Sequence, residues 1–393
     1  MARRSHTRAA QGAGTIRQRK DGRWEARYTV GRDPGTGKQI QRSVYGATQQ
    51  EVRKKLAQVT TALDCGDYFQ PSKMTLARWV ELWLQEYTSD KKYLTVKHYT
   101  AQCKTHIVPS LGAVKLAELT APQIQAFYNG LLRDGMAPKS VRNIHGILTK
   151  CLSTAVSVEY IRDNPASRVT LPRVEKKEIH PLTDEQVKDF LRVSAGDEYE
   201  ILLKVILFTG LRESEAIGLT WDCVDFKAGT VKVCKQLQKR PLSDGGFTFA
   251  PLKNDKTRTL RPAPFVLELL ERRKREQAEQ RLKAGELWVG WQTTDQQKSA
   301  LVFTTATGSN LSPQTVYNHY KKLASQIGAP DSRVHDLRHT FAVLSLQNGD
   351  DVKTVQGNLG HATAAFTLDV YGHVSERMKE DSAARMQEYI SNL

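Results

Sequence analysis

The sequence lacks the features of membrane proteins and of secreted proteins. No apolar run among its 393 residues approaches the roughly 20 residues that a membrane-spanning helix needs. The first ten residues, MARRSHTRAA, lack the apolar core of a secretory signal peptide. The five cysteines, at positions 65, 103, 151, 223 and 234, form no CxxC pair and no Cys/His cluster with zinc-ligand spacing. We therefore expect a cytoplasmic protein with reduced, structural cysteines and no metal site.

Positive charge, by contrast, is abundant. Lys and Arg number 58 against 42 Asp and Glu, so the net charge is +16, and the sequence pI is about 9.6. Residues 1–68 carry 14 basic and 6 acidic side chains, which is half of this excess. Such a distribution indicates a polyanionic partner, although composition alone leaves RNA and acidic membranes as alternatives to DNA. The length predicts two or three domains, and 39% hydrophobic residues suffice for their cores.

The first domain is expected over residues 1–68, as a three-stranded sheet backed by one helix. Three strand-like runs are separated by the turn signals DG at 21–22 and PGTG at 34–37. Thr48 and Glu51 then form a capping-box pattern where an amphipathic helix begins. Residues 66–73, GDYFQPSK, are expected to be a linker.

One face of this predicted sheet is basic. In the middle strand Arg23, Glu25 and Arg27 alternate with Trp24 and Tyr28, so the charged side chains share a face. A small basic sheet fits the major groove of DNA, where arginine reaches guanines or phosphates. Arg23 and Arg27 are therefore candidate DNA contacts, and a merely solvated face is the alternative.

Residues 69–168 predict a second, all-helical domain. Its apolar residues recur at helical spacing, as in Leu76, Trp79, Val80 and Trp83. Four basic side chains on the opposite faces are candidate phosphate contacts, with solvated side chains as the alternative: Lys97, Lys104, Lys139 and Arg142. Residues 169–180 carry charges and a proline without periodicity, and they are expected to form a linker that lets two domains close around a duplex.

Residues 181–393 predict a mainly α-helical domain with a small antiparallel sheet. Thr183 is expected to cap one helix, and an apolar helix, ILLKVILFTG, is expected to end at Gly210. Strands are predicted at 230–233, at 247–253, in TRTLRP and in VFTT (302–305). Further helices are predicted over 264–284, 312–326, 335–349 and 352–358.

This domain also holds polar groups suited to phosphodiester chemistry. Arg212 stands in TGLRESEAIGL, and His335 and Arg338 lie three residues apart in VHDLRHT, on one face of a helix. His361 and Tyr371 follow in LGH and DVYGH. A phosphodiester enzyme must neutralise the non-bridging oxygens, supply a nucleophile and protonate the leaving alkoxide. Arginine suits the first task because its planar fork binds phosphate in a bidentate manner.

These motifs carry a resemblance to a known family. The segments TGLRESEAIGL, LKNDKTRTL, HDLRHTFA, LGH and TLDVYGHV resemble, in this order, the catalytic boxes of the tyrosine recombinase (lambda-integrase-like) family. Residues 1–68 look like the arm-binding domain of phage and conjugative-transposon integrases, and residues 69–168 resemble the core-binding domain. The implied fold is multidomain: an α+β arm-binding domain, an all-α bundle and a mainly α catalytic domain with a small antiparallel sheet.

The resemblance also implies roles for individual residues. Arg212 and Arg338 would clamp the scissile phosphate, while His335 would hydrogen-bond a phosphate oxygen and assist proton transfer. His361 occupies the position where the family has His or Trp and would contribute a hydrogen-bond donor. Tyr371 would be the nucleophile, giving a 3′-phosphotyrosyl link and a free 5′-hydroxyl.

Other assignments are less direct. The family's general acid is a lysine on a β-hairpin loop, for which Lys253 fits best and Lys256 is the alternative, because KNDKTRTL is about one residue shorter than the common spacing. Glu215 would orient the arginine of the first box. His339 is assigned to packing or capping, and Tyr389 to an apolar contact of an amphipathic carboxy-terminal helix that packs in cis or on a neighbouring subunit.

The implied activity is site-specific recombination. The chain would act as a tetramer on core-type and arm-type sites in double-stranded DNA, through a Holliday junction, in the nucleoid. An excisionase or a DNA-bending protein is a candidate partner. The covalent intermediate conserves bond energy, so neither ATP, a metal nor another cofactor is expected, and the sequence has no P-loop and no carboxylate cluster. A type IB topoisomerase and a non-catalytic DNA-binding regulator are the alternatives.

Overall fold

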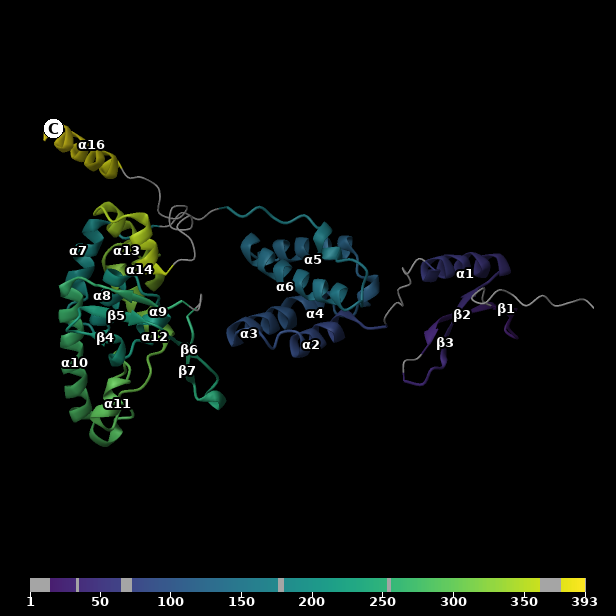
Figure 1. Cartoon of the computed structure of the whole chain (residues 1–393), viewed down its shortest axis with the longest axis horizontal. Helices are drawn as coiled ribbons and strands as arrows, with labels where there is room; N and C mark the ends of the chain where they lie inside the picture. The colour runs from purple at the N-terminus through teal and green to yellow at the C-terminus, as the bar shows by residue number, and fades with distance from the viewer. Residues whose placement is uncertain are drawn as a thin grey trace, which may run out of the picture. The chain divides into compact units, whose positions relative to one another are not determined.

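The computed structural model describes residues 15–32, 35–64, 73–175, 180–252, 256–360 and 376–392. The chain divides into two compact units, Met1–Lys176 and Lys177–Leu393. Figure 1 labels their helices and strands. No helix in the described ranges is long and apolar enough to cross a membrane. The further division of the chain into functional domains stays a prediction.

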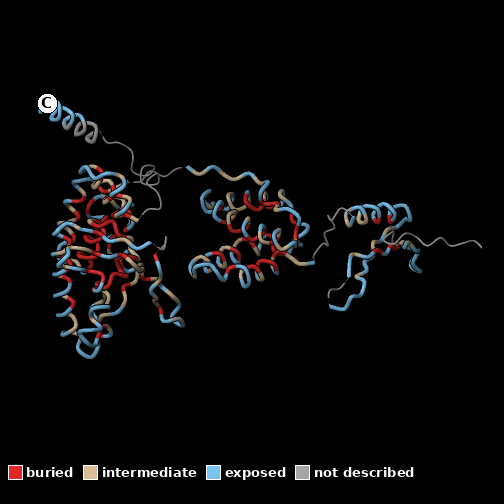
Figure 2. The backbone as a smooth tube through the Cα atoms, viewed as in Figure 1, coloured by how far each residue is buried: buried red, intermediate tan, exposed pale blue. Residues whose placement is uncertain are grey.

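The amino-terminal sheet has the predicted architecture. Strands β1 (Thr15–Gln18), β2 (Trp24–Arg32) and β3 (Gln39–Gly46) form an antiparallel sheet in this order, and α1 (Gln49–Asp64) follows. The core between sheet and helix is small, with the buried residues Ala26, Tyr28, Val52 and Leu56 (Figure 2). The predicted alternation of β2 is therefore confirmed, because its apolar side chains face α1 and its charged ones the other side.

A helical bundle with its own core follows in the same unit. Its elements are α2 (Leu76–Glu86), α3 (Tyr93–Gln102), a π-helical turn (Cys103–Ile107), α4 (Val108–Leu111), α5 (Ala121–Arg133) and α6 (Pro138–Ser157). Two indole N–H groups fix α2 against α6: Trp79 donates to the carbonyl of Cys151, and Trp83 to the hydroxyl of Thr154, both at 3.1 Å. The apolar stripe predicted for α2 thus forms part of the core.

The second unit is mainly helical. Its helices are α7 (Asp184–Val193), α8 (Glu200–Thr209), α9 (Glu213–Ala216), α10 (Pro264–Ala284), α11 (Thr294–Lys298), α12 (Pro313–Gln326), α13 (Val334–Gln347), α14 (Val352–Leu359) and α16 (Glu376–Ser391). Nearly every residue of α8 is buried, so this helix is the centre of the unit (Figure 2). The predicted helix bounds agree to within two residues for α10, α12, α13 and α14.

The strands of this unit form a small sheet and a separate hairpin. β4 (Val224–Asp225), β5 (Thr230–Val233) and β8 (Arg258–Leu260) pair in this order, and β6 (Gln236–Lys239) pairs with β7 (Phe247–Ala250). The strand predicted over 247–253 ends at Ala250, because Pro251 has no N–H for the ladder.

The strand predicted for VFTT at 302–305 is wrong. Within this segment only Thr304 makes an isolated bridge to a described residue, Asn310, and Leu301 directly before it makes another, to Thr220. Side chains of α10 bond its carbonyls instead: Arg273 donates to those of Val302 (3.0 Å) and Thr304 (3.3 Å), and Gln277 to that of Leu301 (2.9 Å). These backbone groups are therefore satisfied without a partner strand.

Candidate active site

The turn between α8 and α9 places Arg212. Gly210 ends α8 in a left-handed conformation (φ 65°), and a Cβ there would lie 2.5 Å from Cδ1 of Phe341. Only glycine fits such a position without displacing that ring. Arg212 is the N-cap residue of α9 and has an extended backbone (φ −69°, ψ 147°). The predicted end of one helix and start of the next are both confirmed.

Glu215 joins Arg212 to a second arginine, Arg258, for which the sequence alone predicts no role. Its carboxylate accepts from Nη1 (2.7 Å) and from the backbone N–H (3.0 Å) of Arg212. Arg258 of β8 binds both oxygens of the same carboxylate, with Nη2 at 2.6 Å and Nη1 at 3.2 Å. The Glu215 side chain is 1% exposed, and those of Arg212 and Arg258 are 21% and 10% exposed.

These contacts keep Glu215 ionised. Burial alone would raise its pKa, but the hydrogen bonds and charges of Arg258 and Arg212 outweigh burial and lower the pKa to about 2. The carboxylate is therefore negative across the neutral range. It holds the guanidinium groups of Arg212 and Arg258 at fixed positions.

The last carbonyls of α14 bind three different arginines. Arg258 Nε donates to the carbonyl of Asn358 at 2.8 Å. Arg338 Nη2 donates to that of Leu359 at 2.6 Å, and Arg212 Nη2 to that of Gly360 at 3.4 Å. The carboxy-terminal end of a helix carries unpaired carbonyls and a partial negative charge, which favours cations. The end of α14 is thus the point where the arginines from three distant segments converge.

Gly360 permits this convergence. It ends α14 in a left-handed conformation (φ 64°), and a Cβ at this position would lie only 3.1 Å from Arg258 Nη1. Glycine therefore satisfies both the backbone and the space that Arg258 needs. The predicted helix end before His361 is confirmed.

Helix α13 contributes Arg338 and His335. Arg338 is 1% exposed, and its Nη1 also donates to the carbonyl of Gly210 at 2.6 Å, which ties α13 to the turn before Arg212. His335 is exposed, and its ring centroid lies 4.8 Å from that of His339, with the two rings perpendicular. Partial desolvation, then the neighbouring His339 and Arg338, lower the pKa of His335 to about 4. His335 is therefore a neutral imidazole at pH 7, able to donate one N–H and accept one proton.

A second carboxyl group beside Arg212 behaves differently from Glu215. Glu213, the first residue of α9, has a buried Oε1 atom without a hydrogen-bond partner in the described part of the chain. Burial raises the pKa of Glu213 to about 7. This group is therefore partly protonated at neutral pH, unlike Glu215.

Three predicted catalytic residues lie outside the described residues: Lys253, His361 and Tyr371. Lys256, the alternative to Lys253, is described and exposed, two residues before Arg258. Tyr389 on α16 is 62% exposed, so the apolar contact expected for it is not found among the described residues.

Sequence reasoning missed Arg258 as a site residue. It is 43 positions from Glu215 along the chain, and no spacing rule connects the two. A usable signal was present, since an arginine follows the KNDK turn inside a segment that already resembles a catalytic box.

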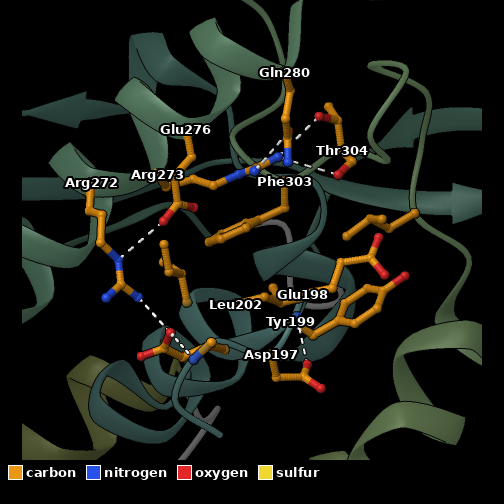
Figure 3. Close-up of a pocket in the computed structure, with 14 residues that line it drawn as sticks. Asp197, Glu198, Tyr199, Leu202, Arg272, Arg273, Glu276, Gln280, Phe303 and Thr304 are labelled. Carbon is orange, nitrogen blue, oxygen red and sulfur yellow. Dashed lines mark hydrogen bonds and ion pairs between the residues drawn. The ribbon is translucent and has the colours of Figure 1, made fainter. Parts of the chain in front are cut away.

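A separate cavity of about 230 Å³ lies at the other end of α8, lined by the residues shown in Figure 3. One of its lining residues, Arg272, pairs with two carboxylates that also line it. Arg272 contacts Glu200 at 2.9 Å and Glu276 at 3.3 Å. Because α8 has ten residues, the cavity is about 15 Å from the arginine cluster. The cavity is therefore not part of this site.

The predicted DNA contacts of the first unit are all exposed. Arg23 pairs with Asp21 in the β1–β2 turn at 2.9 Å, and Arg27 donates to Glu25 at 3.2 Å. Arg142 donates to the carbonyl of Pro172 at 2.9 Å, so it also fixes the segment after the bundle. The other three, Lys97, Lys104 and Lys139, lie on α3, the π turn and α6. Exposure permits a role in DNA binding, which stays a prediction for all of them.

Comparison with known proteins identifies the family. Residues 175–378, more than half of the chain, match the model of the phage integrase family. The chain belongs to this family. It is a tyrosine recombinase, as the sequence analysis predicts. Residues 75–132 of this recombinase match the phage integrase N-terminal SAM-like domain.

Curated relatives match this recombinase over nearly its whole length. A tyrosine recombinase XerC-like protein of Caldanaerobacter subterraneus subsp. tengcongensis is 26% identical over 92% of this chain and 94% of that protein. The ICEBs1 integrase of Bacillus subtilis (strain 168) is 23% identical over 96% of this chain and 100% of that protein.

Solved structures share the fold of this recombinase. The Tn1549 transposon integrase in complex with transposon right end DNA has a TM-score of 0.67 and 19% identity, over 80% of this chain and 100% of that one. A lambda integrase dimer bound to a COC′ core site has a TM-score of 0.56 and 19% identity, over 94% of this chain and 99% of that one. The predicted multidomain fold is confirmed.

Proposed function

We propose that this recombinase is the integrase of a mobile element, which cleaves and rejoins duplex DNA through Tyr371. The observation that carries the proposal is the convergence of Arg212, Arg258 and Arg338 at the end of α14, directly before the segment that holds His361 and Tyr371. A cluster of fixed arginines suits the transfer of a phosphoryl group, because it can neutralise the charge on the phosphate oxygens.

In the proposed cleavage the phenol oxygen of Tyr371 attacks the scissile phosphorus. The bond from phosphorus to the 5′ oxygen breaks, which leaves a 3′-phosphotyrosyl link and a 5′-hydroxyl. Arg212 and Arg338 neutralise the non-bridging oxygens, and Lys253 protonates the leaving 5′ oxygen. Rejoining reverses these steps, with the 5′-hydroxyl of a partner strand as the attacking group. The exchange of one ester for another requires no external energy source.

His335 fits the proton transfer at the tyrosine. A phenol has a pKa of about 10, so it needs a base or a strongly cationic neighbourhood to react at neutral pH. The lowered pKa of His335 keeps its imidazole neutral, so it can accept that proton or donate an N–H to a phosphate oxygen. We assign Glu215 and Arg258 a positioning role, because Glu215 binds the guanidinium group of Arg212 and Arg258 binds both oxygens of Glu215.

The remaining assignments follow the same proposal. Residues 1–68 would bind arm-type sites, residues 69–168 and 181–393 would enclose the core site, and four subunits would carry the strand exchange through a Holliday junction. A lambda integrase tetramer bound to a Holliday junction, with a TM-score of 0.56, supports this arrangement. An excisionase or a DNA-bending protein would set the direction of the reaction.

Covalent capture tests the proposal. The full chain is incubated in EDTA with a pool of nicked duplexes of random sequence, and DNA that stays attached under denaturing conditions is recovered and sequenced. We expect a common core sequence joined through its 3′ phosphate. Tyr371→Phe should form no adduct yet still bind the recovered duplex, while Tyr389→Phe should react normally. An adduct that persists in Tyr371→Phe would overturn the assignment. Joined products from two recovered duplexes distinguish recombination from the relaxation that a topoisomerase performs.

A further inference from the structure

The exposed face of the amino-terminal sheet has a buried carboxylate at its centre. Glu25 lies on the face of β2 that points away from α1, and yet it is only 3% exposed. Its Oε1 accepts from the hydroxyl of Ser43 at 2.8 Å, with the hydroxyl of Tyr45 at 3.5 Å. Arg17 and Arg27 supply the other donors. The hydrogen bond from Ser43 and then the one from Arg17 lower the pKa of Glu25 to about 2, so the carboxylate is ionised.

Arg17 and Arg27 each contact Glu25 with one edge of the guanidinium group, and the opposite edge makes no contact with this carboxylate. Arg17 contacts Oε2 through Nε and Nη2, both at 2.7 Å. Arg27 donates Nε to Oε1 at 3.2 Å and makes no other side-chain hydrogen bond among the described residues. The two side chains are still 57% and 45% exposed. Each guanidinium is thus fixed by its inner edge, while its outer N–H groups are accessible from the solvent side.

A carboxylate in this place is unexpected for a surface that binds phosphates. Glu25 cancels one of the two arginine charges, which weakens attraction to any polyanion. What the carboxylate provides is orientation, since it restricts two long side chains to one geometry each. Fixed geometry matters most for base edges, where the two parallel N–H groups of arginine match O6 and N7 of guanine. Contacts to phosphates position a protein and carry no sequence information directly.

We propose that Glu25 is a specificity-determining residue, which aims Arg17 and Arg27 at guanines in the major groove of duplex DNA. The cross-strand register supports this role, because Glu25 lies opposite Arg17 on β1 and Tyr45 on β3, at the centre of the three-stranded face. The inference rests on the proposed function, in which residues 1–68 bind DNA. Beyond that proposed function, the inference names guanines as the bases that this face selects and Glu25 as the residue that orients the arginines for this selection.

The test begins with selection by the intact protein. The full chain is used to enrich bound sequences from random duplexes without nicks, beside a variant with Arg17→Ala and Arg27→Ala. We expect two enriched motifs from the wild type, and the double variant should lose one of them. The lost motif should contain guanines that 7-deazaguanine, which lacks N7, weakens about tenfold or more. If both motifs survive in the double variant, this sheet selects no bases and the inference is overturned.

Glu25→Gln then isolates the carboxylate. Its affinity for the lost motif should fall about tenfold, while its affinity for unrelated duplexes should stay equal or rise, because a negative charge has been removed. These opposite signs separate the role from misfolding, which would lower both affinities. Glu81→Gln is the matched control: it makes the same change in another carboxylate that pairs with an arginine, Arg78, on the exposed surface of α2, and should leave the preference unchanged.

Arg27→Lys provides an independent variant if Glu25→Gln does not fold. It keeps the charge and loses the fork, so the salt dependence of binding should persist while the preference for guanine weakens at the position that Arg27 reads. Full guanine preference in both Glu25→Gln and Arg27→Lys would overturn the inference. Because covalent capture at the core site does not depend on this preference, normal capture together with that result would leave the proposed function intact.

Discussion

Two glutamates in this chain hold pairs of arginines, in settings that differ in exposure. Glu215 in the second unit and Glu25 in the amino-terminal sheet each accept from two guanidinium groups, and in both the pKa is lowered to about 2. Around Glu215 the arginines are largely buried and also bond the carbonyls at the end of α14. Around Glu25 the arginines are about half exposed.

The difference shows that one local motif can serve two purposes. Buried arginines with several protein partners are fixed on all sides, which suits a site that must stabilise one transition-state geometry. Exposed arginines fixed only at the inner edge remain available to an incoming partner, which suits recognition. We therefore expect substitutions in the first cluster to affect stability and chemistry, and those in the second to affect the choice of sequence.

The largest expected effect is on stability. Glu215→Gln should lower the free energy of unfolding of the second unit by about 3–5 kcal/mol, because it leaves buried arginine charges without their partner. Glu25→Gln should change the stability of the sheet little, because its arginines remain hydrated. Urea titration with hydrogen exchange read on peptides from each unit measures both effects. Equal losses of unfolding free energy in Glu215→Gln and Glu25→Gln would show that the two clusters do not differ in their contribution to stability.

A smaller effect is expected on chemistry. Arg258→Lys keeps the charge but cannot bind both oxygens of Glu215, so Arg212 should lose its fixed orientation. We expect adduct formation at saturating protein to slow by about 10- to 100-fold, as for other residues that orient a reacting group. Arg261→Lys is the matched control, since Arg261 is exposed, lies three residues further on, and among the described residues donates only to the carbonyl of Ala228. A normal rate of adduct formation in Arg258→Lys would show that Arg258 has no positioning role in the active site.

A last effect is expected on the dependence of stability on pH. Because the pKa of Glu213 is raised from 4.5 to about 7, the folded state binds this proton more tightly than the unfolded state. Its contribution to stability is therefore complete below about pH 4.5 and is lost as the pH rises through 7. In Glu213→Gln the decline in stability between these values should be shallower than in the wild type, as measured by urea titrations at several pH values. Parallel curves for both proteins would contradict the raised pKa.

The local parts of this architecture could be predicted from the sequence. The end of α8 at Gly210, the cap at Arg212 and the alternation in β2 all follow from the conformational preferences of neighbouring residues. The role of Arg258 could not, because its partners Glu215 and Asn358 are 43 and 100 positions away. The strand at 302–305 was wrongly predicted for a related reason, because side chains of α10 bind the backbone carbonyls that a partner strand would otherwise bind. Contacts made only by the tertiary fold leave no periodic signal in the sequence.

One experiment tests the central claim that the two arginine pairs have separate tasks. Binding affinity and the single-turnover rate of adduct formation at saturating protein are measured on one nicked duplex that carries the core site and the motif of the sheet. Glu25→Gln should weaken binding and leave the rate unchanged, whereas Arg258→Lys should slow the rate and leave binding unchanged. A slower rate in Glu25→Gln at saturation, or a loss of affinity alone in Arg258→Lys, would contradict the account.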